Sequence, residues 1–138
     1  MTTPPAATQL TTDIQSVLPD AVAAWLYGSA ASGSMNAESD IDIAVLLPPH
    51  DARKTTWSLR EKAQALATRW DREVDLVSFS AVSCVLQKEI LTAGQPLFSK
   101  DDLVVGNAEL WALSQYREFN ERNAEEFTRI ARAGKVFS

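Results

Sequence analysis

The chain has 138 residues, a length that fits one domain with its own hydrophobic core. Its 13 basic and 18 acidic residues give a net charge of −5, which argues against a broad surface for nucleic-acid phosphates. One cysteine excludes an internal disulfide and a multi-cysteine zinc site, and indicates the cytoplasm. Without a signal-peptide pattern or an apolar run near the ~20 residues of a membrane span, secretion and membrane insertion are not expected.

The first part of the chain predicts an arm, a helix and two strands. Residues 1–9 are small, polar and proline-containing, which favours a flexible arm. An apolar stripe at helical spacing then predicts a helix over residues 10–18. Apolar runs over 21–27 and 41–47 predict buried strands, and the second is expected to be central because only Asp42 interrupts it.

The remainder alternates helices with strands. We expect a helix over 54–70, a strand over 74–79, and a helix from an N-cap at Ser80 to a C-cap at Gly94. A short edge strand over 95–99 and a long amphipathic helix over about 104–133 complete the chain. This alternation predicts an α/β fold, in which a mixed sheet is flanked by helices and residues 10–138 form one domain.

Charge is spread unevenly along the chain. Residues 1–52 contain six acids but neither lysine nor arginine. An acidic segment without cations of its own favours a divalent metal.

The densest concentration of reactive side chains begins at the end of the first expected strand. Gly28-Ser29 offers a tight turn, close backbone approach and a hydroxyl. Asp40 and Asp42 begin the next strand, and residues two apart in a strand face the same side. Two neighbouring carboxylates repel each other, and a Mg²⁺ ion with oxygen ligands relieves that repulsion.

A third acid, Asp75, interrupts the apolar strand over 74–79. If this strand lies beside the Asp40–Asp42 strand with Asp75 on the same face, three carboxylates surround two metal positions about 3.5–4 Å apart, as in-line nucleotidyl transfer requires. The alternative is an edge-strand residue that only faces solvent.

These motifs resemble a known family. Gly28-Ser29, ten intervening residues, Asp40-Ile41-Asp42 and the later Val74-Asp75-Leu76 resemble the nucleotidyltransferase superfamily of DNA polymerase beta, in its minimal nucleotidyltransferase (MNT) branch. The segments over 86–98 and 116–137 are similar to MNT antitoxins that pair with HEPN-domain toxins. The resemblance extends over most of the chain from about residue 10.

The resemblance implies an antitoxin that acts as a protein adenylyltransferase. AMP would pass from ATP to a tyrosine of the cognate HEPN ribonuclease and neutralise it, with two Mg²⁺ ions as cofactors. Gly28 and Ser29 would contact the triphosphate, and Asp40, Asp42 and Asp75 would be the metal-binding and catalytic residues. Asp75 would complete one metal site and act as catalytic base or orient the attacking hydroxyl.

One position departs from the family pattern. Many members have Arg-Gly after the Gly-Ser turn, whereas this chain has Ser32-Gly33. Loss of that guanidinium removes a charge-assisted phosphate contact, which Arg60, Arg72 or Lys88 would have to replace.

Two other functions stay open. A non-catalytic antitoxin would neutralise its toxin through a stable interface, with a vestigial nucleotide pocket. A small-molecule nucleotidyltransferase, acting for example on an aminoglycoside, is less favoured because the chain lacks a second domain for the acceptor. The C-terminal helix suits either the domain's own core or another subunit, so a homo- or hetero-oligomer is compatible with the sequence.

Overall fold

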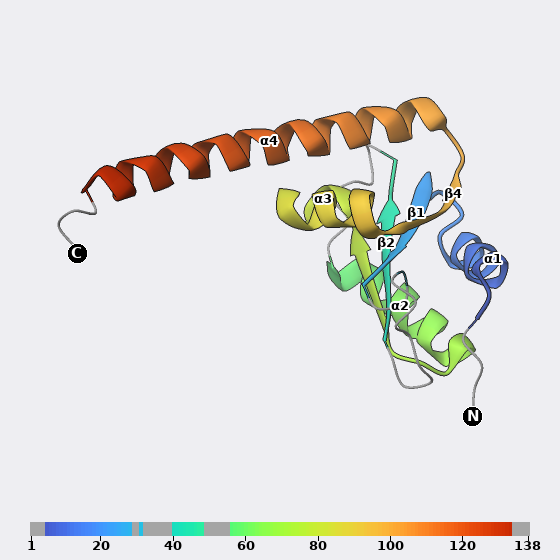
Figure 1. Cartoon of the computed structure of the whole chain (residues 1–138). Coiled ribbons are helices and arrows are strands. Elements are labelled where there is room, and N and C mark those ends of the chain that lie inside the picture. The colour runs from blue at the N-terminus through green and yellow to red at the C-terminus, as the bar shows by residue number, and fades with distance from the viewer. Residues whose placement is uncertain (1–4, 29–30, 32–39, 49–55, 134–138) are drawn as a thin grey trace.

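The computed structural model describes residues 5–28, 31, 40–48 and 56–133. Their elements confirm the expected alternation of helices and strands (Figure 1). In chain order they are α1 (Ala7–Val17), β1 (Ala23–Tyr27), β2 (Ile41–Leu46), α2 (Thr56–Trp70), β3 (Val74–Ser78), the 3-10 turn η2 (Phe79–Ala81), α3 (Cys84–Ala93), β4 (Gln95–Ser99) and α4 (Asp102–Ala133).

The strands form one mixed sheet in the order β3-β2-β1-β4. β1 pairs antiparallel with both β2 and β4, whereas β2 and β3 pair in parallel. A parallel pair requires a crossover connection, and α2 lies within the connection between these two strands. The sheet and its helices confirm the expected α/β fold, and β4 is an edge strand as expected.

The sheet is buried between two layers of helices. Leu26 and Ile43 face a core cluster that includes residues of α1 and α2. Trp25 and Ala44 face a second cluster, which contains Ile90 of α3 and the first half of α4. Because successive strand residues point to opposite faces, burial on both faces explains the uninterrupted apolar runs of β1 and β2.

Two helix starts differ from the sequence prediction. α1 begins at Ala7, so residues 7–9 are helical and do not belong to the expected arm. α3 begins after Ser83, whose Oγ accepts a hydrogen bond from the Leu86 backbone N–H at 3.2 Å. The predicted cap, Ser80, instead lies in η2, beside the buried Phe79 that anchors this turn in the core.

We call the sheet together with α1, α2 and α3 the body of the domain. Only the first half of α4 packs against this body. Val105 and Ala112 belong to the second core cluster, whereas every side chain from residue 117 to residue 132 is exposed. The second half of the helix projects well beyond α3 (Figure 1). Among the described residues, no helix, α4 included, combines the length and apolar character needed to cross a membrane.

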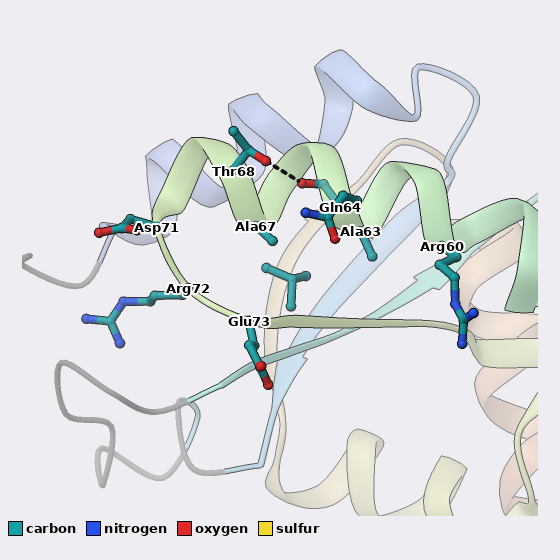
Figure 2. Close-up of a pocket in the computed structure, with 9 residues that line it drawn as sticks. Arg60, Ala63, Gln64, Ala67, Thr68, Asp71, Arg72 and Glu73 are labelled. Atoms are coloured by element: carbon teal, nitrogen blue, oxygen red, sulfur yellow. Dashed lines mark hydrogen bonds between the residues drawn. The ribbon is translucent and has the colours of Figure 1, made fainter.

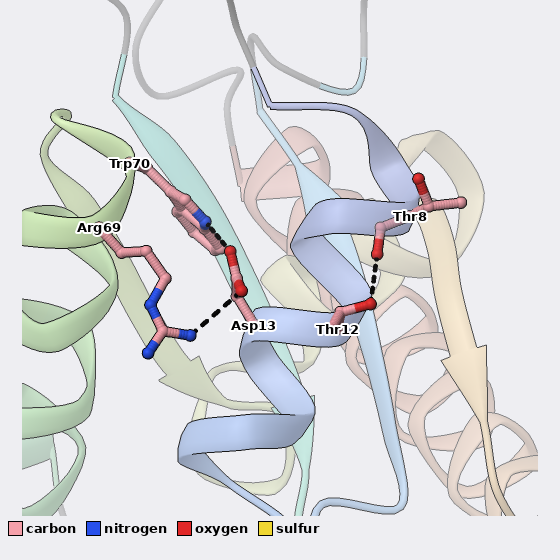
Figure 3. Close-up of polar contacts among 5 residues, drawn as sticks. All are labelled: Thr8, Thr12, Asp13, Arg69 and Trp70. Carbon is pink, nitrogen blue, oxygen red and sulfur yellow. Dashed lines mark hydrogen bonds and ion pairs between the residues drawn. The ribbon is translucent and has the colours of Figure 1, made fainter.

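Asp13 joins α1 to α2 through two polar contacts (Figure 3). Its Oδ2 accepts a hydrogen bond from Trp70 Nε1 at 2.7 Å, and its Oδ1 accepts one from Arg69 Nη1 at 3.1 Å. Trp70 is 4% exposed, whereas the Arg69 side chain is 46% exposed. Water can replace the exposed arginine contact but not readily the buried indole contact. The hydrogen bond to Trp70 should therefore account for most of what Asp13 contributes to the free energy of unfolding.

We expect Asp13→Ala to lower the free energy of unfolding by about 1–3 kcal/mol, because the buried indole N–H loses its acceptor. Arg69→Ala is the control, and it should cost only about 0–1 kcal/mol because exposed ion pairs contribute little. Urea denaturation followed by tryptophan fluorescence measures both values. Equal losses in the two variants would contradict this ranking.

Candidate active site

Three adjacent strands place Tyr27, Asp42 and Asp75 in one row across the sheet. The antiparallel register pairs Tyr27 with Asp42, and the parallel register pairs Asp42 with Asp75. Residues paired across neighbouring strands project from the same face. Tyr27 belongs to the core cluster that contains Ile90 of α3, so the row lies on the α3 face of the sheet. Asp75 is exposed on its edge strand, yet it faces the same side as Asp42.

Asp40 lies immediately before β2 and is exposed. It precedes Asp42 by two residues, and its charge contributes to the raised pKa of the Asp42 carboxyl. The fold therefore brings together the three acids that the sequence singled out. They do not converge into a closed cage, because the described residues contain no group of three Asp, Glu, His or Cys side chains that could hold a metal ion.

The electrostatics of the row reflect this concentration of negative charge. Burial raises the pKa of Asp42, and the charges of Asp75 and then Asp40 add to the shift. Burial also raises the pKa of Tyr27 to about 12, with further contributions from Asp75 and Asp42. Tyr27 therefore retains its hydroxyl proton at neutral pH. A divalent cation beside the row would offset the repulsion among the carboxylates.

Gly28 holds the turn that follows β1 directly against Asp42. It has φ +71°, a backbone conformation that disfavours residues with a Cβ. A Cβ at this position would overlap Asp42 Oδ2 and lie 3.4 Å from Asp42 Cγ. Glycine is thus required both by the backbone and by the neighbouring carboxylate. Ser29, the second residue of the motif, and Ser32 lie outside the described residues.

A polar cavity of about 820 Å³ lies between α2 and the start of β3 (Figure 2). Arg60 and Arg72, two of the basic residues considered for phosphate binding, both line it, and Arg72 is buried. The third, Lys88, lies over the ring of Tyr116, 5.3 Å from its centroid, and so joins α3 to α4. The cavity includes Val74 but none of the three acids, so it is beside the carboxylate row and separate from it.

Tyr27 is the residue of this row that sequence analysis does not single out. It ends an apolar strand, and such a residue is typical of a hydrophobic core. The available signal is its position: Tyr27 directly precedes Gly28 and lies two residues after Trp25, on the same side of β1.

Gly28→Ala should lower the free energy of unfolding by about 1–2 kcal/mol from the left-handed backbone alone, and by more because of the Asp42 contact. The matched control is Gly106→Ala, since a Cβ there meets no atom within 4 Å. This helical control should stabilise the protein by roughly 0.5–1 kcal/mol. Thermal and urea denaturation compare the two variants, and a harmless Gly28→Ala would refute the close packing against Asp42.

Comparison with known proteins gives a consistent assignment. Residues 11–103 match the family described as polymerase beta, nucleotidyltransferase. The protein adenylyltransferase MntA of Shewanella oneidensis is 35% identical over 103 residues, which are 73% of this chain and 68% of that protein.

Solved structures show the same fold. A crystal structure of a toxin–antitoxin with AMP-PNP aligns with a TM-score of 0.67 and 30% identity, covering 93% of this chain and 98% of that one. A tri-AMPylated Shewanella oneidensis HEPN toxin in complex with its MNT antitoxin aligns with a TM-score of 0.70 and 23% identity, covering 91% and 95%. The chain therefore belongs to the polymerase beta family of nucleotidyltransferases and, within it, to the group that contains the MntA adenylyltransferase.

Proposed function

We propose that this protein is an antitoxin that transfers AMP from ATP to a tyrosine of a cognate HEPN ribonuclease toxin and thereby neutralises it. One observation supports this above all: Asp42 and Asp75 are paired in register beside Gly28, with Asp40 two residues before Asp42. The acids lie at the starts of β2 and β3, next to the turn that follows β1, and neighbouring carboxylates of this kind suit the two metal ions of nucleotidyl transfer.

The relatives agree with this chemistry. MntA of Shewanella oneidensis is a protein adenylyltransferase, and a structural relative was crystallised with AMP-PNP, an analogue of ATP. The HEPN toxin seen with an MNT antitoxin is tri-AMPylated. An MNT antitoxin that shares this fold thus stands beside an acceptor that bears the product of the proposed reaction.

We assign Asp40 and Asp42 as ligands of two Mg²⁺ ions, with Asp75 completing one of the sites. The residues fit such ions because Asp42 and Asp75 project from one face, with Asp40 two residues before Asp42. Burial raises the pKa of the Asp42 carboxyl, and the negative charges of Asp75 and Asp40 raise it further. Their open arrangement also fits, since Mg²⁺ commonly takes one or two carboxylates and completes its shell with substrate phosphates and water. When bound, the ions would neutralise charge on the phosphates of ATP.

In the transfer itself, the tyrosine oxygen of the toxin attacks the α-phosphorus of ATP. The bond from that phosphorus to the oxygen that bridges to the β-phosphorus breaks, and pyrophosphate leaves. Asp75 accepts the tyrosine proton or orients the hydroxyl for attack. Gly28 lets the backbone approach the triphosphate, to which Ser29 would add its hydroxyl. Arg60 and Arg72 line the cavity at the start of β3, and Arg72 precedes Asp75 by three residues.

We further propose that residues 10–138 act as one nucleotidyltransferase domain and that the protein works in the cytoplasm. The family match over residues 11–103 supports the first statement. An ATP substrate and a single cysteine agree with the second.

Asp40→Asn and Asp42→Asn should each reduce AMP transfer roughly 10²-fold or more, because each loses a ligand worth several kcal/mol of transition-state charge stabilisation. Intact-mass measurement of the HEPN toxin, incubated with Mg²⁺ and ATP, detects each added AMP. Asp20→Asn, an exposed acid outside the row, is the control and should transfer normally. Undiminished transfer by both site variants would refute the assignment of the active site.

A growth assay separates catalysis from simple binding. If the antitoxin acts by AMP transfer, cells that express the toxin should be rescued by the wild type and not by the Asp40→Asn/Asp42→Asn variant. Full rescue by that variant would instead establish the non-catalytic antitoxin.

A further inference from the structure

An apolar stripe on α4 continues past the part of the helix that the body covers. The stripe starts at residues buried against α3 and the sheet, and it ends on large apolar side chains that are exposed. Its members lie three, four, seven or eight residues apart, the spacing of one helix face. They are Val105, Ala112, Tyr116, Phe119, Phe127 and Ile130.

The rest of the domain packs against this stripe only as far as Tyr116. Lys88 of α3 lies over the Tyr116 ring, and the Tyr116 ring lies 6.5 Å from that of Phe119. Beyond this point Phe127 is 73% exposed and Ile130 is 51% exposed. We call residues 117–132 the arm, and Phe119, Phe127 and Ile130 the arm strip.

The size of the arm strip limits what can cover it. The arm is about 24 Å long and one face of a helix is about 10 Å wide, so the strip offers on the order of 200–300 Å². A specific interface needs about 800 Å² per partner. Two arms pairing face to face would not reach this area, whereas a protein that also contacts the body beside α3 would.

The direction of the arm strip indicates the side on which that protein lies. The strip continues the face of α4 that packs on α3, and α3 covers the sheet face that holds the Asp42–Asp75 row. Figure 1 shows the arm extending past the end of α3, so that helix and body enclose an angle. The arm contains four arginines and four glutamates, a balance that disfavours RNA as the occupant.

We propose that the arm strip is the docking surface for the acceptor protein, which it holds in the angle between the arm and α3, on the face of the sheet that carries the catalytic acids. This inference rests on the proposed function, because the occupant is the toxin that receives AMP. It gives the acceptor a binding surface on the same side of the sheet as Asp42 and Asp75.

Phe127→Asp and Ile130→Asp should each weaken binding of the HEPN toxin at least tenfold, as expected when an apolar anchor is replaced by a charge. Thr128→Asp adds the same charge to the arm outside the strip, and it should bind as the wild type does. Isothermal titration without ATP measures these affinities. AMP transfer by the strip variants should fall at low toxin concentration and recover at saturating toxin, an effect on KM and not on kcat.

Other outcomes would overturn either this docking surface or the proposed activity, and the assays tell the two apart. Unchanged affinity in both strip variants, or no binding of toxin by the wild type, would remove the toxin from this surface. A wild-type dimer that the strip substitutions dissociate would identify a second copy as the occupant. Strip-dependent binding without any AMP transfer by the wild type would refute the proposed activity and leave the docking surface in place.

Discussion

The parallel pairing of β2 with β3 is the constraint on which the candidate site depends. It places Asp75 opposite Asp42, while the preceding and following pairs, Ile41 with Val74 and Ile43 with Leu76, face the opposite core. A slip of one residue would turn Asp75 away from Asp42 and expose apolar side chains. The core that stabilises the fold therefore also fixes the distance between two like charges.

Placing Asp42 opposite Asp75 costs electrostatic free energy, and the burial of apolar side chains in the strands offsets this cost. Like charges directly opposite each other on neighbouring strands are destabilising. Here the cost appears in the raised pKa of Asp42, to which burial contributes most. Hydrophobic packing on both faces of β2 supplies the compensating free energy, since all its residues except Asp42 are fully buried. The carboxylates of Asp42 and Asp75 are thus held side by side, and Gly28 keeps the space next to Asp42 free of a side chain.

The sequence predicts the helices and strands, and it singles out the three acids as candidate site residues, because hydrophobic periodicity and motif spacing are local properties of the chain. It could not decide which way Asp75 faces, since that depends on the register with a strand more than thirty residues away. It chose Ser80 over Ser83 as the helix cap because both serines precede a helical pattern, and only the burial of Phe79 separates them. The sequence does not single out Tyr27 as a site residue, because an aromatic residue at the end of a buried strand is typical of a hydrophobic core.

The long C-terminal helix shows a different limit of sequence patterns. Its apolar stripe is uniform along the chain, so periodicity predicts the helix but not which half meets the body. The fold answers this because α3 is only ten residues long and cannot cover a helix of 32 residues. One half of α4 therefore completes the domain, and the other half extends away from it.

The most direct test of the account is whether nucleotide binding needs a divalent cation held by the carboxylate row. Isothermal titration of AMP-PNP into the wild type and Asp42→Asn, each with Mg²⁺ and with EDTA, measures this dependence. We expect Mg²⁺ to tighten binding to the wild type at least tenfold and to have little effect on the variant. Equal affinities with and without Mg²⁺ in the wild type, or the same Mg²⁺ dependence in both proteins, would contradict the central claim.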